Sequence, residues 1–595
     1  MEIASDDTKK TREIKRQKGG LRTMPFIIAN EAFEKVAGVG LHANMIVYLQ
    51  NEYNLSSATG ATILFLWLAI SYFTPILGAF VSDSYLGRFL VIVLGTLISI
   101  LGIILLWLTA IIPSARPPHC DQIDGNLQGC ASPNAAQLLF LLSAFALMAI
   151  GAGGIRPCSL AFGADQFDNP NNPRNEKTLQ SFFNWYYASV GISVMVSVIF
   201  IVAIQDAAGW VIGFGVPVGF MLLSITMFLM GSSRYIKLKA DKSLLSGFAQ
   251  VIAATWKKKN LSLAPYDSDK WYYHKGSKFI VPTEKLSFLN KACVIRNPDK
   301  ELDSDGLAVD PWNLCTVKQV EELKALMKVL PIWSTGIMIS VTLSQQAFPV
   351  LQAETMDRRF IGKAKIPAGS FGVFTILTLT IWVAIYDQVL VPRIAKITKR
   401  PRGLTNKQRM GMGLALSCLA TAMAGAVEHQ RRATALNEGL ADKPKGQVNM
   451  SAMWLVPQHC LTGLAEALNA IGQIEFYYSQ FPKTMTSIGV ALFSLGMAFG
   501  NLVGSLIVGV LSHATSNNDE KVSWVSNNLN KGHYDYYYWL LSGLSVVNLF
   551  YYLICSRAYG SEDLRISDVA EAIEEDEDEE EMDKTVESQI KFASV

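Results

Sequence analysis

The sequence predicts an all-α membrane protein, and three observations support this fold class. Half of the residues are hydrophobic, only 17% are charged, and the mean hydropathy is positive. Uncharged apolar runs recur along the chain, and many have the length of about twenty residues that a helix needs to cross a bilayer. Because lipid offers no partner to a backbone N–H or C=O group, such runs are expected to be helices.

Twelve spans are expected, in two groups of six. The first group fills residues 25–231 and the second fills residues 327–556. A polar, Lys-rich linker, 232–326, separates them. The expected spans are roughly 25–49, 58–82, 89–113, 136–160, 181–205, 209–231, 327–350, 369–391, 408–428, 452–474, 486–512 and 535–556. The layout predicts two six-helix bundles, flanked by a basic N-terminus, 1–24, and an acidic tail, 557–595.

Lysine and arginine in short loops set the expected orientation, because basic loops stay in the cytosol. Both termini and the linker therefore fall on the cytosolic side of the bilayer. Within the linker, residues 244–256 end in three lysines and are expected to form an amphipathic helix on the membrane surface. The rest of the linker favours a solvated loop. Cys120 and Cys130 share one loop and are candidates for a disulfide if that loop is extracellular.

Three charged residues stand inside the first span. Glu31, Glu34 and Lys35 are spaced by three and four residues, which puts them on one helix face. Charges in hydrocarbon are costly, so they normally pair, face an internal cavity and mark a route for ions or substrate. Two carboxylates and an amine on one stripe favour a proton-handling site.

Two further charges lie within spans. Arg156 is expected to close the fourth span, where glycines allow close helix approach and Pro157 perturbs the helix end. Glu466 lies in the tenth span, in the other half of the chain. The alternative for Arg156 is a basic side chain that extends from a helix end to the interface.

Some function classes are disfavoured by what the sequence lacks. It contains no nucleophile–base pattern, no phosphate-binding loop and no metal-ligand spacing, so an enzyme, a cofactor and a metal site are not expected. Nucleic acid is not an expected partner either. The isolated Gly-rich stretch before Arg156 is better explained by helix packing.

Several long motifs in order resemble known transporter signatures. The segment Gly78–Arg88, which contains Asp83, resembles the loop signature of major facilitator transporters. Segments Phe162–Phe167, with Asp165, and Phe183–Tyr187 resemble signatures of proton-coupled oligopeptide transporters. Residues from Pro311 to Thr335 resemble the plant nitrate/peptide transporter family. The resemblance implies a major facilitator fold of twelve transmembrane helices in two six-helix bundles, which works by alternating access.

The resemblance also implies roles for the charged residues. Glu31, Glu34 and Lys35 match the E-x-x-E-[R/K] motif, in which protonation of the acids is coupled to substrate movement. Arg156 and Glu466 are then expected to face each other across the cavity, to close one gate as an ion pair and to contribute to substrate binding with Lys35. Three residues are expected to brace the cytosolic helix ends as a gating or structural motif: Asp83, Arg88 and Asp165.

Two departures from the peptide-transporting relatives bear on the cargo. Gly38 and Val39 stand where those relatives carry a Tyr-Tyr pair, and Leu343 and Ser344 stand where the seventh helix often carries an acid or a histidine. A dipeptide needs both signs of charge, whereas a small anion needs chiefly a cation. The missing histidine makes recognition by an imidazole unavailable at that place.

These departures favour proton-coupled transport of a small anion, nitrate first. A larger organic anion, such as a plant hormone or a glucosinolate, is the main alternative, and di- or tripeptides are less favoured. A transporter-like sensor that signals through its linker and tail is a rival of another class. The expected partners are the anion, protons and the lipid bilayer, and the expected state is a monomer or a weak homodimer. The plasma membrane is the expected location, with the vacuolar membrane as the alternative.

Overall fold

The computed structural model describes residues 19–20, 22–118, 131–167, 175–238, 244–261, 272–274, 281–304, 306–361, 364–398, 403–482, 485–516 and 522–560. Helices make up most of this part of the chain. Cys120 and Cys130, the first eighteen residues and the acidic tail lie outside the described residues. The disulfide therefore stays a prediction.

The helices coincide with the spans expected from the sequence. In the first half they are α2 (Met24–Ala43), α3 (Met45–Asn51), α4 (Ser57–Val81), α5 (Arg88–Ile111), α6 (Ala135–Asp165), α7 (Asn175–Val196) and α8 (Val202–Met230). In the second half they are α11 (Val317–Leu343), α12 (Ala347–Glu354), α13 (Val373–Ile385), α14 (Val391–Thr398), α15 (Asn406–Asn437), α16 (Val456–Gln480), α17 (Thr486–Thr515) and α18 (Tyr534–Tyr559). The described residues contain nine helices that are long and apolar enough to cross a membrane.

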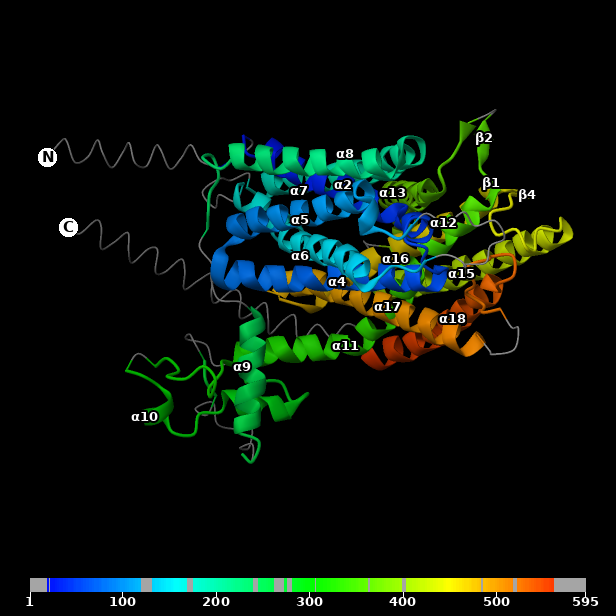
Figure 1. Cartoon of the computed structure of the whole chain (residues 1–595). Coiled ribbons are helices and arrows are strands. Elements are labelled where there is room, and N and C mark those ends of the chain that lie inside the picture. Colours follow the sequence, from blue (N-terminus) through cyan, green and yellow to red (C-terminus); the bar gives the residue numbers. More distant parts are fainter. Residues whose placement is uncertain are drawn as a thin grey trace. The chain divides into compact units, whose positions relative to one another are not determined.

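The chain forms two compact units, which are described separately. The larger unit holds residues 1–241, 336–471 and 494–550, and the smaller holds 242–335, 472–493 and 551–595. In the larger unit α6 packs against α4 and α5, and α2 packs against α7 and α8 (Figure 1). A single buried apolar cluster in this unit joins α2, α4, α5, α6 and α8 with α12, α15 and α18. The proposed division into two six-helix bundles is a different partition and stays a prediction.

Two very short sheets lie in the second half of the chain. Strand β1 (Met356–Asp357) pairs in parallel with β4 (Val448–Ser451), and β2 (Arg359–Ile361) pairs antiparallel with β3 (Ala364–Lys365). All four lie in segments between helices, and Met356 of β1 and Val448 of β4 are buried, with Met356 in the apolar cluster of the larger unit.

Glycine decides how closely α6 approaches its neighbours. A Cβ atom added at Gly78 of α4 would lie 2.0 Å from the carbonyl oxygen of Gly153, and one added at Gly95 of α5 would lie 2.8 Å from that of Gly151. The backbones are therefore in direct contact, which a side chain would prevent. This packing confirms the interpretation of the Gly-rich stretch and holds the following turn of α6, with Arg156, against the bundle.

The expected end of the fourth span is wrong. Helix α6 continues through Pro157 and ends at Asp165, about two turns later. A proline inside a helix removes one backbone hydrogen bond but does not have to end the helix when neighbouring helices hold it. Arg156 consequently lies inside the helix, and the alternative of a terminal basic side chain reaching the interface is not supported.

The boundary between the fifth and sixth spans is a kink, and no loop separates them. The helical backbone runs from α7 through a π-helical turn, η4 (Ser197–Ile201), into α8. Gly209 breaks it with a φ of +78°. Glycine adopts this left-handed conformation without the steric cost that a side chain brings, so the chain reverses at the position where the sequence predicts the boundary.

The linker contains the helix predicted at residues 244–256, and it is also folded around residues 287–315, where the sequence analysis expects solvated loop. In the smaller unit, α9 (Leu244–Lys257) lies across the start of α11 (Figure 1), and Gln319 donates a 3.3 Å hydrogen bond to Gln250. Residues Leu289, Ala292, Cys293, Val294, Leu314 and Cys315 are buried beside it. Lys258 is 1% exposed and donates to the carbonyl oxygen of Val294 at 2.8 Å. The missed signal was the two short apolar runs in this polar segment, Ala292–Val294 and Leu314–Cys315.

Candidate proton-coupling and substrate site

Helix α2 buries both carboxylates of the first-span charge cluster. Glu31 and Glu34 are 2% and 3% exposed. The Lys35 ammonium lies 3.2 Å from Glu31 Oε1 and 3.3 Å from Glu34 Oε2. The three- and four-residue spacing thus brings the side chains together on one face, as predicted.

Arg156 of α6 completes this cluster. Its Nη2 and Nε atoms donate to Glu34 Oε1 at 3.3 and 3.4 Å, while Lys35 occupies the other carboxylate oxygen. Glu34 is therefore shared by two cations. With two carboxylates and two cations, the cluster of Glu31, Glu34, Lys35 and Arg156 carries a formal charge of zero. Neutralising Glu34 would leave it with one excess positive charge, next to Arg156.

Gly38 lies next to the ion pair of Glu34 and Arg156. A Cβ atom added at Gly38 would lie 3.6 Å from Glu34 Oε1 and 3.8 Å from Arg156 Nη2, which is ordinary contact distance. Any larger side chain at this position would therefore press on the Glu34–Arg156 pair. Because glycine has no side chain, residue 38 itself places no side-chain atom against the pair.

Glu466 is not joined to Arg156 in this structure. It lies in α16 and forms no ion pair with any residue that the structure describes, whereas Arg156 is engaged by Glu34. Tyr72 of α4 is within electrostatic reach of Arg156, Glu466 and Lys35. The gate between Arg156 and Glu466 stays a prediction.

Sequence reasoning named Glu34 and Arg156 but missed the contact between them, and it missed Tyr72. The contact between Glu34 and Arg156 joins residues 122 positions apart, and nothing local signals it. Tyr72 could have been found from the sequence: it places a hydroxyl group inside an apolar span, and such a group needs a polar neighbour.

The three residues of the expected structural motif lie together. Arg88 Nη1 donates to both carboxylate oxygens of Asp165, at 2.6 and 2.7 Å, and Arg88 Nε lies 3.7 Å from Asp83 Oδ1. Gly87 precedes the arginine with a φ of +76°, a conformation that favours glycine, and so turns the chain from α4 into α5. The motif ties the adjoining ends of α4, α5 and α6 to one another.

The aromatic residues of α7 divide into two kinds. Tyr186 is 4% exposed and is an electrostatic neighbour of Glu31. Trp185 and Tyr187 are 64% and 61% exposed, as side chains on the outside of a span would be. Of these three aromatics only Tyr186 is placed to contribute to the charge cluster. Within the described part of the chain, no group of three His, Cys, Asp or Glu side chains is arranged to hold a metal ion.

Comparison with known proteins agrees with this architecture. The family model described as "PTR2: POT family" matches residues 89–525. The chain is 53% identical to the Arabidopsis thaliana protein NRT1/PTR FAMILY 1.1 over 550 residues, which covers 92% of each chain. It is 54% identical to the Arabidopsis protein NRT1/PTR FAMILY 1.2 over 555 residues, covering 92% of this chain and 91% of the relative.

Solved structures show the same fold. The crystal structure of the POT family transporter PepTSo superposes with a TM-score of 0.66 at 18% identity, covering 91% of this chain and 99% of that one. The major facilitator fold of twelve helices is therefore confirmed. With the family model and the close relatives in agreement, the chain belongs to the POT family of multi-pass, proton-coupled membrane transporters, in its NRT1/PTR branch.

Proposed function

We propose that the protein is a symporter that carries a small anion, nitrate first, together with protons. The observation that supports this most directly is the sharing of Glu34 by Lys35 and Arg156, each at 3.3 Å. As long as Glu34 is ionised, both cations are compensated. A proton on Glu34 removes that compensation, and the freed guanidinium of Arg156 can then bind an anion.

The charge balance of the cluster links proton and anion binding. Protonation of Glu34 raises the cluster from neutral to one positive charge, and a bound monovalent anion returns it to neutral. The cluster is therefore neutral when it holds both the proton and the anion, and also when it holds neither. With only one of the two bound, it carries a net charge in a low-dielectric site. If Glu31 carries a second proton, two protons accompany each anion and the cycle moves one net positive charge inward.

Release would follow when Glu34 loses its proton. The carboxylate then competes with the anion for Arg156 at short range, and the pair reforms. In our proposal Arg156 also binds Glu466 in the empty, closed state, so that the two halves of the chain close on each other. The Arg88–Asp83–Asp165 motif would brace the helix ends during this movement.

The site favours an anion over a peptide. Gly38 places no side chain of its own against the Glu34–Arg156 pair. Leu343 at the end of α11 and Ser344 directly after it offer no charge, and the Ser344 hydroxyl donates to the carbonyl oxygen of Ser340 at 2.8 Å. A peptide amine would therefore find no carboxylate at this place. A larger organic anion satisfies the same charge rule and is the second candidate.

Location and assembly belong to the same proposal. We place the transporter in the plasma membrane, with both termini in the cytosol and the chain divided into bundles at 25–231 and 327–556. A monomer meets every requirement of this mechanism, because all the proposed site residues come from one chain.

The proposal is tested by uptake of isotope-labelled nitrate into cells that express the full chain. Uptake is expected to rise in acidic medium and to be accompanied by inward current if two protons move. Excess dipeptide should inhibit little, and inhibition by a hormone-like organic anion would identify the second candidate. Uptake no greater than in cells lacking the protein, at either pH, contradicts the nitrate assignment.

A further inference from the structure

Three Asn-x-Ser sequences stand in the chain, and each is a candidate acceptor for an N-linked sugar. They begin at Asn54, Asn260 and Asn449, and none has proline in the middle position. The transferase that attaches such a sugar works in the lumen of the endoplasmic reticulum, which corresponds to the outside of the cell. An acceptor must therefore lie on that side of the membrane, and the folded protein must leave room for a bulky sugar.

The side chain of Asn449 lies open to solvent. Asn449 and Ser451 belong to β4 and are exposed, whereas Val448 of the same strand is 0% exposed. Side chains two residues apart in a strand point to the same side, so both groups of the acceptor sequence face outward. The backbone N–H of Asn449 donates to the carboxylate of Glu438, at 3.1 and 3.3 Å. This contact fixes the strand and leaves the side-chain amide without a hydrogen-bond partner among the described residues.

The segment around this acceptor is built to lie in water. It connects α15, which ends at Asn437, to α16, which begins at Val456, and residues 438–447 are mostly polar. Pairing of β4 with β1 holds it against the segment that follows α12 (Figure 1). In the proposed orientation the segment between the ninth and tenth spans is extracellular. The inference therefore rests on that part of the proposed function, and it does not depend on the cargo.

Asn54 is closed to the same modification by the fold. Its side chain is 8% exposed, and its amide donates to the carbonyl oxygens of Pro118 and Ala131, at 3.3 and 3.1 Å. The Ser56 hydroxyl is engaged as well, because it accepts from the backbone N–H of Thr59 at 3.0 Å and caps α4. An amide that carries a sugar retains a single N–H group. One of the two amide hydrogen bonds would therefore be lost, and the buried site leaves no room for the sugar.

Asn260 differs from Asn449 in its expected side of the membrane and not in exposure. It follows α9 in the smaller unit and is exposed. In the proposed orientation the linker is cytosolic, and the transferase does not act there. Asn260 is therefore a reporter of orientation, because a sugar at this position requires the linker to lie outside.

We propose that Asn449 carries an N-linked oligosaccharide and that Asn54 and Asn260 carry none. The donor is an oligosaccharide joined to a lipid diphosphate, which the transferase uses. The Nδ2 atom of Asn449 forms a bond to C1 of the first sugar, and the bond between C1 and the phosphate oxygen breaks. The lipid diphosphate leaves with the electron pair of that bond, and the amide proton passes to a base of the transferase.

The test uses the full chain with a C-terminal epitope tag, expressed in human cells, whose N-linked sugars peptide N-glycosidase F removes. Treatment of the wild type is expected to raise its electrophoretic mobility by the step of one glycan and to leave aspartate at position 449, which mass spectrometry detects. Asn449→Gln and Ser451→Ala should show no change in mobility, whereas Ser451→Thr keeps the hydroxyl and should keep the change. Asn54→Gln and Asn260→Gln are the matched controls and should behave as the wild type.

Protease digestion of sealed microsomes locates the tag independently, because only a cytosolic tag is accessible in them. A digested tag without any mobility change overturns the proposal and leaves the orientation intact. A change that is lost in Asn54→Gln and kept in Asn449→Gln also overturns it. A change that is lost in Asn260→Gln, together with a protected tag, overturns both the proposal and the orientation. None of these readouts involves nitrate, so the cargo assignment is tested separately.

Discussion

Replacement of Glu34 by Gln separates the proton from the anion in the proposed mechanism. Glutamine keeps the shape and one acceptor oxygen but loses the charge that Lys35 and Arg156 share at 3.3 Å each. At an effective dielectric constant of about 20, each of these attractions amounts to about 5 kcal/mol before desolvation is counted. The variant should therefore resemble the proton-loaded state permanently, with one excess positive charge in the cluster.

The expected consequence is tight anion binding without coupling. An anion that recovers only about 1.4 kcal/mol of the attraction released by Glu34 binds tenfold more tightly. Its affinity should also become less dependent on pH, because Glu34 no longer competes for Arg156. A pH gradient should cease to drive accumulation, since the shared carboxylate can no longer take up a proton, whereas exchange of anion for anion should continue.

Proteoliposomes containing the full chain separate these two activities. Accumulation of labelled nitrate is measured with an imposed pH gradient, and counterflow is measured without one. Glu52→Gln is the matched control: Glu52 pairs with Arg116 outside the charge cluster, so this variant should keep gradient-driven uptake. Accumulation by Glu34→Gln equal to that of wild type, or an unchanged affinity for nitrate, would refute the reasoning.

Three other predictions concern stability. Asp165→Asn removes the charge from the contact between both Asp165 carboxylate oxygens and Arg88. Because charged hydrogen bonds contribute about 1–2 kcal/mol when the cation is partly exposed, as Arg88 is, the unfolding free energy should fall by that amount. The measurement is the thermal midpoint, and an unchanged midpoint counts against the bracing role. Arg431→Met leaves the fully buried Glu428 without its cation and should lower the unfolding free energy by about 3–5 kcal/mol. Adding Glu428→Leu removes the unpaired charge and should restore part of this loss. A double variant that is no more stable than Arg431→Met would contradict the prediction. Burial raises the pKa of the Cys293 thiol from 9.0 to about 12, so the folded linker keeps a proton that the unfolded chain loses. The free energy of unfolding of this segment, measured by denaturant titration at each pH, should therefore fall between about pH 9 and 12, and Cys293→Ala should reduce that fall.

The fold was largely predictable because its signals are local. An apolar run of spanning length is visible in any window of sequence, and each expected span coincides with a helix or a pair of helices. The boundary near residue 207 was also predictable, and Gly209 accounts for it. The fourth span was misjudged at Pro157, because whether a proline ends a helix depends on the neighbours that hold it.

The structure of the linker was predictable only in part. Its helix α9 was predictable from its amphipathic pattern, but the packed segment around Cys293 was expected to be loop. Lys258 looked like one of three equivalent surface lysines, yet the structure buries it against Val294 and leaves Lys257 half exposed. Burial of a single lysine is decided by contacts with residues distant in sequence.

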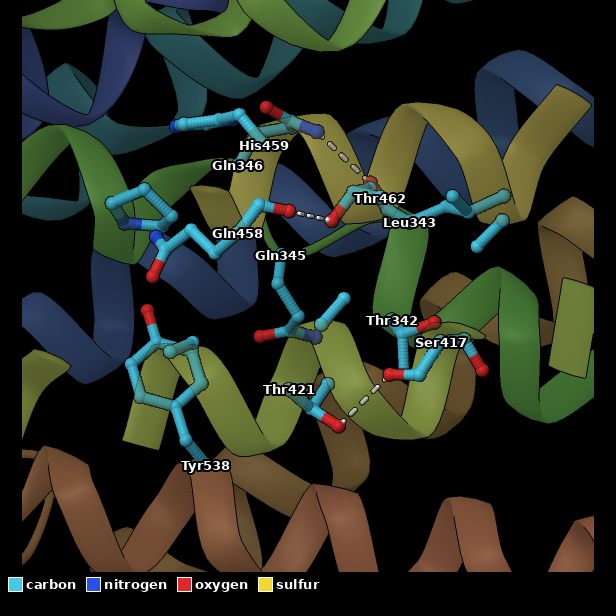
Figure 2. A pocket seen from close by; sticks show the side chains of 14 residues that line it. Thr342, Leu343, Gln345, Gln346, Ser417, Thr421, Gln458, His459, Thr462 and Tyr538 are labelled. Atoms are coloured by element: carbon cyan, nitrogen blue, oxygen red, sulfur yellow. Dashed lines mark hydrogen bonds between the residues drawn. The ribbon is translucent and has the colours of Figure 1, made fainter. Parts of the chain in front are cut away.

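The sequence alone determined the fold class, the family and the presence of charges in the first, fourth and tenth spans, because composition and spacing along one helix are local properties. Only the tertiary structure decided which charges meet. Arg156 comes to Glu34 through the close glycine packing that holds α6 against α4 and α5. The pocket lined by Thr421, Gln458 and Tyr538 is likewise assembled from several helices, among them α15, α16 and α18 (Figure 2). Contacts between helices depend on how backbones pack in three dimensions, and spacing along a single chain does not contain that information.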